Sequence, residues 1–123
     1  MKIANGTDII EIRRIKKCID RNGDKFLKRI FTDNEIRYCE SRKFQKFQSY
    51  AVRFAAKEAV YKALSDYIDF EYSWRDFEVQ NNALGKPKIK LNFQIANLES
   101  IEISLSHCKE YAIANVVAIY KEN

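Results

Sequence analysis

The spacing of apolar residues changes once along this 123-residue chain, near residue 66. Before that point apolar residues recur every three to four positions, as on one face of a helix; after it they alternate with polar residues, as on one face of a strand. Helices followed by strands favour an α+β fold, with N-terminal helices packed on a mainly antiparallel sheet. Because 123 residues is an ordinary length for one domain, we expect a single domain, residues 1–123.

Four helices are expected in the first half. Their spans are about 12–22, 24–31, 32–42 and 48–65. Thr32 and Glu35 have the spacing of a capping box, in which each side chain bonds the other's backbone at a helix start. The longest helix has no Gly or Pro and carries Ala51, Ala55 and Ala59 on one stripe. Such a narrow stripe lets another backbone approach closely.

Strands are expected at the start of the chain and through the second half. Their spans are about 9–12, 77–80, 89–93, 101–105 and 111–120, with a turn at 81–87. Only a few residues, 106–110, join the last two. We therefore expect those two strands to form an antiparallel hairpin.

The net charge of +5 is unevenly placed: residues 1–62 carry +8 and residues 63–123 carry −3. A basic half predicts an anionic partner, which charge alone leaves open among nucleic acid, a phosphate-rich cofactor and an acidic protein. No run of 18 apolar residues and no signal-like start is present, so a cytoplasmic protein without a membrane partner is expected.

Several site types are excluded by what the chain lacks. Three glycines are too few for a phosphate-binding loop or a dinucleotide fingerprint. Cys18, Cys39 and Cys108 have no metal or redox spacing, which predicts reduced thiols and argues against zinc.

Carboxylate chemistry remains. Asp8 lies next to the first residue of the first expected strand, and Glu58 lies among alanines in the longest helix. A half-buried carboxylate is costly unless it is paired or bound to a metal, and two carboxylates suit Mg²⁺. Lys62 is one turn beyond Glu58, and a simple surface ion pair between them is the competing interpretation. His107, at a strand end, has an equally simple structural interpretation.

Four segments, in this order, resemble the holo-[acyl-carrier-protein] synthase family. They are Gly6–Ile12, Arg53–Leu64, Gly85–Pro87 and Ser104–His107. The most specific is the Ala-Lys-Glu-Ala…Lys-Ala pattern within Arg53–Leu64. The resemblance spans nearly the whole chain. It implies the 4′-phosphopantetheinyl transferase fold, assembled as a homotrimer with active sites between subunits.

The resemblance also implies an activity, the Mg²⁺-dependent transfer of 4′-phosphopantetheine from coenzyme A to a serine of apo acyl carrier protein, in fatty acid biosynthesis. Asp8 and Glu58 are implied as metal ligands, and Lys62 as the group that neutralises the pyrophosphate. Glu58, directly or through a metal-bound water, is the implied base. Contacts with coenzyme A are implied for Arg53, Lys57, Lys62, Lys86 and His107, and contacts with the acidic carrier protein for Arg13, Arg14 and Arg21.

A nucleic-acid-binding module without catalysis is the main alternative. Its basic helices would bind DNA or RNA in a salt-dependent way and give no turnover. The phenylalanines argue against it, since periodicity assigns them to core faces and leaves no stacking platform.

Overall fold

The computed structural model describes residues 1–122. The helices are α1 (Ile12–Asn22), α2 (Asp24–Ile30), α3 (Asp33–Ser41) and α4 (Lys46–Leu64). The strands are β1 (Lys2–Glu11), β2 (Phe77–Asn81), β3 (Pro87–Leu91), β4 (Leu98–His107) and β5 (Tyr111–Tyr120). The α+β prediction is therefore confirmed, with element bounds within a few residues of those expected, except that β1 begins well before the expected strand.

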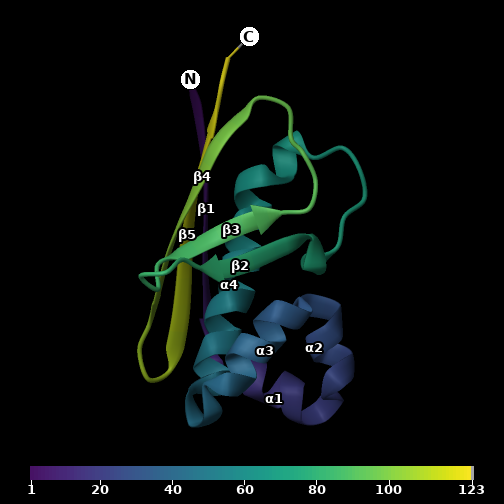
Figure 1. The fold of residues 1–123 in the computed structure, drawn as a ribbon, viewed down its shortest axis with the longest axis vertical. Coiled ribbons are helices and arrows are strands. Elements are labelled where there is room, and N and C mark those ends of the chain that lie inside the picture. The colour runs from purple at the N-terminus through teal and green to yellow at the C-terminus, as the bar shows by residue number, and fades with distance from the viewer. Residues whose placement is uncertain (123) are drawn as a thin grey trace.

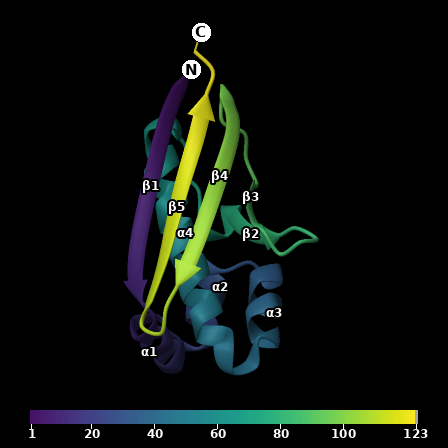
Figure 2. The ribbon, with the colours of Figure 1, turned by 90° about the vertical axis from the view of Figure 1, so that its left-hand side faces the viewer.

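The strands form two antiparallel sheets rather than the single sheet expected. One has three strands in the order β1-β5-β4, and the other is the hairpin β2-β3. The central strand of the larger sheet is therefore β5, which pairs with β1 over its full length, from Lys2 opposite Tyr120 to Glu11 opposite Tyr111. Figure 2 shows these three long strands side by side, with both chain ends at the same end of the sheet. The predicted hairpin of β4 and β5 is confirmed.

Helix α4 lies along the inner face of the three-stranded sheet, and the other helices gather around its N-terminal half (Figure 1). Small side chains make this close packing possible. The expected stripe of Ala51, Ala55 and Ala59 is fully buried on α4, and Ala112 and Ala114 are fully buried on β5. The structure confirms the role predicted for the stripe.

Gly6 is the point of closest approach between α4 and β1. A Cβ atom built on Gly6 would lie 2.1 Å from the Ala59 carbonyl oxygen, far inside van der Waals contact. Only glycine fits at this position, because any side chain would clash with the α4 backbone. Side chains alternate along a strand, so Asp8, two residues on, points to the same face and lies beside α4. The close contact between Gly6 and α4 therefore also places Asp8, a candidate metal ligand, beside the helix.

The capping box predicted at the start of α3 is present. The Thr32 hydroxyl accepts from the Glu35 amide at 3.2 Å, and the Glu35 carboxylate accepts from the Thr32 amide at 2.9 Å. Both side chains are buried, and the second Glu35 oxygen accepts from the Val79 amide of β2 at 2.7 Å. The cap thus also joins α3 to the small sheet.

No helix within residues 1–122 is long and apolar enough to cross a membrane. Cys18, Cys39 and Cys108 are all free thiols: Cys39 is buried, Cys18 is partly buried and Cys108 is exposed.

Candidate functional site

Asp8, Glu58 and Lys62 meet where β1 crosses α4. The Lys62 ammonium lies 3.3 Å from an Asp8 carboxylate oxygen and donates to the Thr7 carbonyl at 2.8 Å. Lys62 is therefore paired across two elements, so the simple helix-surface pair with Glu58 does not describe it. Burial raises the pKa of Glu58 and the charge of Asp8 raises it further, whereas Lys62 lowers it. The two carboxylates and the ammonium are therefore close enough to interact electrostatically with one another.

A cavity of about 280 Å³ opens at this place and contains both carboxylates. Arg14 of α1 and Phe54 of α4 also line it. Within residues 1–122 no cluster of three or more His, Cys, Asp or Glu side chains could enclose a metal by itself. Two carboxylates beside an open cavity fit Mg²⁺, which keeps several ligands from water and substrate phosphates. The donor set fits a magnesium ion completed by a phosphorylated substrate.

A second cavity, of about 310 Å³, is lined by the predicted residues Arg53 and His107, together with Gly85 and Pro87 of the β2–β3 turn. Arg53 is almost fully buried, and its Nε has no hydrogen-bond partner among the described residues. Its two other nitrogens make only long contacts of 3.4 Å, to the Ser49 carbonyl and the Asn81 side chain. An arginine with unused donors at a cavity wall suits an anion such as phosphate.

The two cavities lie on opposite faces of α4. Phe54, Glu58 and Lys62 follow each other at four-residue spacing on one face, whereas Ser49 and Val52 line the other cavity from roughly the far side of the helix. Within one protomer, α4 therefore separates Asp8 and Glu58 from the predicted residues Arg53 and His107.

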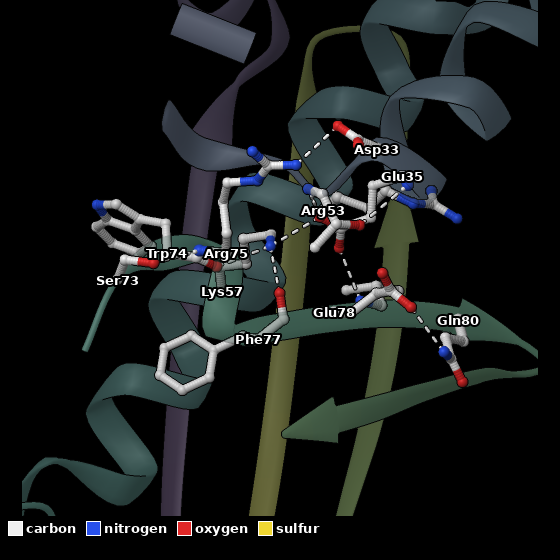
Figure 3. A network of polar contacts seen from close by, with 12 residues as sticks. Asp33, Glu35, Arg53, Lys57, Ser73, Trp74, Arg75, Phe77, Glu78 and Gln80 are labelled. Carbon is white, nitrogen blue, oxygen red and sulfur yellow. Dashed lines mark hydrogen bonds and ion pairs between the residues drawn. The ribbon is translucent and has the colours of Figure 1, made fainter. Parts of the chain in front are cut away.

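Lys57 is in neither cavity, and the expectation that it contacts coenzyme A is wrong. Its side chain has no exposed surface, and its ammonium lies 2.7 Å from the Glu35 carboxylate. It also donates to the carbonyls of Trp74, at 2.9 Å, and Phe77. Figure 3 shows the ammonium at the centre of this network, between helix and strand. Burial lowers the pKa of Lys57, and the Glu35 charge opposes that shift. Lys57 is a structural cation that no ligand can reach.

Substituting Lys57 with Met should destabilise the fold by about 3–5 kcal/mol, because a buried carboxylate is left without its cation. Adding Glu35→Gln removes that charge while keeping the cap, so the double variant should be more stable than Lys57→Met alone. Urea unfolding measures both. As a control, Lys16→Met breaks the exposed pair with Asp20 and should cost less than about 1 kcal/mol. Equal stability of the single and double variants would contradict the assigned pair.

Of the remaining predicted residues, all but Arg14 lie apart from the two carboxylates. Lys86 is exposed at the β2–β3 turn and lines an open trench over the outer face of the large sheet. Arg13 is exposed beside Glu11, at 4.0 Å, and Arg21 is exposed in the last turn of α1. Of the three arginines expected to face a protein partner, only Arg14 borders the carboxylate cavity.

The model of the 4′-phosphopantetheinyl transferase superfamily matches residues 4–116, which is most of the chain. The chain belongs to this superfamily. A holo-[acyl-carrier-protein] synthase of Ruminiclostridium cellulolyticum is 46% identical over 95% of this chain and 92% of that protein. One of Dehalococcoides mccartyi is 49% identical over 94% of this chain and 98% of its own length. The resemblance of the four sequence segments to this family is thereby confirmed.

Solved structures agree with this phosphopantetheinyl transferase assignment. The holo-(acyl-carrier-protein) synthase of Bacillus anthracis, in complex with CoA (3′,5′-ADP), is 40% identical with a TM-score of 0.79, covering 94% of both chains. The Helicobacter pylori enzyme, in complex with coenzyme A, is 37% identical with a TM-score of 0.79, covering 94% of this chain and 99% of that one. The predicted fold is confirmed.

Sequence reasoning missed part of this transferase's second cavity, namely Tyr38 of α3 and Arg42, which directly follows α3. The Arg53 guanidinium lies 4.3 Å from the centre of the Tyr38 ring, and that of Arg42 lies 5.9 Å from it. The signal was present, because Tyr38 and Arg42 are four apart on an exposed helix face. Phe54, which periodicity assigns to a core face, is half-buried: it packs against a core cluster and also lines the carboxylate cavity.

Proposed function

We propose that this phosphopantetheinyl transferase is a Mg²⁺-dependent holo-[acyl-carrier-protein] synthase. It transfers 4′-phosphopantetheine from coenzyme A to a serine of apo acyl carrier protein and releases adenosine 3′,5′-bisphosphate. It works in the cytoplasm, in fatty acid biosynthesis, as a homotrimer. The observation that carries this proposal is the meeting of Asp8, Glu58 and Lys62 at one cavity, in a chain whose relatives are named for this reaction.

The residues at the carboxylate cavity have distinct tasks. Asp8 and Glu58 would hold the metal, which when bound would supply positive charge beside the pyrophosphate. Lys62, held by Asp8 and the Thr7 carbonyl, presents its ammonium to the pyrophosphate oxygens as negative charge develops on the leaving group. The serine oxygen attacks phosphorus, the bond to adenosine bisphosphate breaks, and Glu58 accepts the serine proton. A raised pKa at Glu58 suits that task.

The second cavity binds the 3′-phosphate end of coenzyme A. Arg53, with its unused donors, Lys86 at the adjacent turn and His107 provide the positive or polar groups. Since this cavity is on the far face of α4, one coenzyme A molecule cannot occupy both places on one protomer. The geometry favours a complete site made of the carboxylate cavity of one copy and the phosphate cavity of the next.

Exposed apolar residues on the outer face of the large sheet support such an assembly. Ile3, Ile9, Tyr111 and Ile113 are each more than a third exposed there. Ile9 is directly opposite Ile113, and Tyr111 is next on the same face of β5, so these three form one patch, while Ile3 lies on the same face near the other end of β1. Apolar patches of this kind mark interfaces, and a homotrimer covers it.

His107→Ala should raise the KM for coenzyme A by about tenfold, the effect of losing one charge-assisted contact to phosphate. The KM for dephospho-coenzyme A, which lacks the 3′-phosphate, should not change. His107 is exposed, so the fold should tolerate the change, and Cys108→Ala, next along the chain and also exposed, is the control. Equal increases for both substrates would argue against a 3′-phosphate contact.

The basic first half faces the acidic carrier protein, with Arg13, Arg14 and Arg21 of α1 as contacts. Arg14→Glu should raise the KM for the carrier protein by about tenfold or more, since like charges now meet, and affect that for coenzyme A less. Steady-state kinetics with each substrate varied in turn checks this. Lys88→Glu, an equal charge change on β3, is the control. Equal effects on both substrates would count against docking at Arg14.

The alternative of a nucleic-acid-binding module has no support from the comparisons, in which the relatives are named holo-[acyl-carrier-protein] synthases. We attribute the basic charge to docking of an acidic protein substrate. The decisive experiment is intact-mass spectrometry of apo acyl carrier protein incubated with this protein, coenzyme A and Mg²⁺. We expect a mass gain of one phosphopantetheine that disappears when the metal is chelated. No gain with several carrier proteins would overturn the proposal.

A further inference from the structure

Glu35 joins three of the elements that build the second cavity, although it does not line that cavity itself. Its side chain is buried, and one carboxylate oxygen binds both the Thr32 amide of the α3 cap, at 2.9 Å, and the Lys57 ammonium of α4, at 2.7 Å. The other oxygen accepts from the Val79 amide of β2 at 2.7 Å (Figure 3). Helices α3 and α4 and strand β2 are therefore held together at one buried carboxylate.

A second contact between α3 and β2 lies at the cavity wall and is longer. Tyr38 follows Glu35 by about one turn of α3, and Asn81 follows Val79 by two residues of β2, on the same face of the strand. The Asn81 amide donates to the Tyr38 hydroxyl at 3.3 Å and accepts from Arg53 at 3.4 Å. All three of these side chains line the second cavity. The short hydrogen bonds are thus at Glu35, and the long ones are where a ligand can replace them.

This difference in length matters for Arg53. Its long contacts and its unpartnered Nε leave donors available to a phosphate, but such contacts hold the cavity walls only weakly. A cavity binds its ligand without an ordering cost when its walls are already in place before the ligand arrives. The bonds of the Glu35 carboxylate provide that fixed spacing of α3, α4 and β2.

We propose that Glu35 is a positioning residue for coenzyme A, whose carboxylate fixes α3 and β2 against α4 and so holds the side chains of the second cavity around the 3′-phosphate. This rests on the proposed function, which assigns that cavity to the 3′-phosphate. The position needs a carboxylate because all three partners of the Glu35 side chain are donors. A glutamine has only one accepting oxygen, and if that oxygen stays in the cap, its NH₂ group meets the Val79 N–H. Two donors then face each other, and β2 has to move away from α3.

The test is Glu35→Gln in the full-length protein, with kcat/KM measured for coenzyme A and for dephospho-coenzyme A in the presence of Mg²⁺ and apo acyl carrier protein. We expect the ratio of the two kcat/KM values, coenzyme A over dephospho-coenzyme A, to fall by about tenfold, the effect of misplacing one charge-assisted contact to phosphate. The fall should come from a higher KM for coenzyme A, with kcat within about twofold, because the two carboxylates at the other cavity are untouched. A loss of folded molecules alone would lower both kcat/KM values equally and leave their ratio unchanged.

Thr32→Ala and Glu40→Gln are the matched controls. The first removes the hydroxyl of the same capping box and costs stability, but it leaves the Glu35 carboxylate bound to the Val79 amide. The second makes the same charge change at an exposed residue of α3, whose hydrogen bonds go to α4 side chains instead of β2. Both controls should keep the ratio of the unsubstituted protein.

If Glu35→Gln does not fold, Lys57→Met/Glu35→Gln replaces it, because that double variant leaves no unpaired buried charge. The ratio should fall by the same factor. An unchanged ratio in the Glu35 variant, an equal fall in Thr32→Ala, or failure of both Glu35 variants to fold would overturn the positioning role and leave the proposed function intact. An unsubstituted protein that uses both substrates equally well would instead contradict the assignment of the second cavity to the 3′-phosphate.

Discussion

Glu58→Gln should reduce phosphopantetheine transfer by at least about 100-fold while the protein stays folded, because preorganised charge at the reacting group contributes that much to catalysis. The amide keeps the size of the side chain but removes both the negative charge for the metal and the proton acceptor. Stability should not fall, since burial and the Asp8 carboxylate both disfavour the charged form of Glu58 in the native protein. Intact-mass rates with apo acyl carrier protein and thermal melting measure the two effects.

Glu99→Gln, an equal change at an exposed glutamate of β4, is the control and should retain full activity. Wild-type activity in Glu58→Gln would refute both tasks given to this carboxylate. Asp8→Asn adds a second check, because it removes the partner of Lys62 along with a metal ligand. It should also be inactive, and its requirement for Mg²⁺ should move to higher concentration.

Gly6→Ala should have the largest effect on stability, a loss of about 3 kcal/mol or more. The new methyl group would lie 2.1 Å from the Ala59 carbonyl oxygen and 2.9 Å from the Lys62 Cβ. The closest of these atoms belongs to helix backbone, which cannot rotate away as a flexible side chain can. Relief requires α4 to move off β1. That movement separates Asp8 from Glu58 and Lys62, so activity should fall in the molecules that remain folded.

Gly23→Ala separates this clash from the general cost of replacing glycine. Gly23 has a positive φ of 50°, but nothing lies within 4 Å of the position of its Cβ. Backbone strain alone should cost about 1–2 kcal/mol there. Urea unfolding that places Gly6→Ala at or below the cost of Gly23→Ala would contradict the close contact of α4 with β1.

Local patterns were enough to predict the elements. The period of three to four residues marked the helices, the capping box of Thr32 and Glu35 marked the start of α3, and alternation marked β4 and β5. The alanine stripe also predicted that another segment would approach α4 closely, but it did not predict that this segment would be β1 at Gly6. The length of β1 was underestimated, because Lys2 to Thr7 shows no regular alternation of apolar and polar residues and its strand form depends on β5, at the far end of the chain.

The error at Lys57 has a tertiary cause. The Ala-Lys-Glu-Ala pattern around Lys57 contains no information about Glu35, because Glu35 lies on another helix. From the sequence, Glu35 could be recognised only as part of the capping box of α3. Only the folded chain brings the ammonium to the Glu35 oxygen that also accepts from the Thr32 amide in the cap. Similarly, Arg53 and Glu58 are close in sequence, and only helix geometry shows that they line different cavities.

The pairing of the first strand with the last has a consequence for the time at which the protein becomes active. Residue 2 is opposite residue 120, and β5 is the middle strand of the sheet. On the ribosome, β1 is made first but has no strand to pair with until β5 has emerged. Closing so long a loop is entropically costly, and contacts of this range slow folding. Asp8 therefore reaches Glu58 only after synthesis of β5, and a nascent chain cut short before it should have no transferase activity.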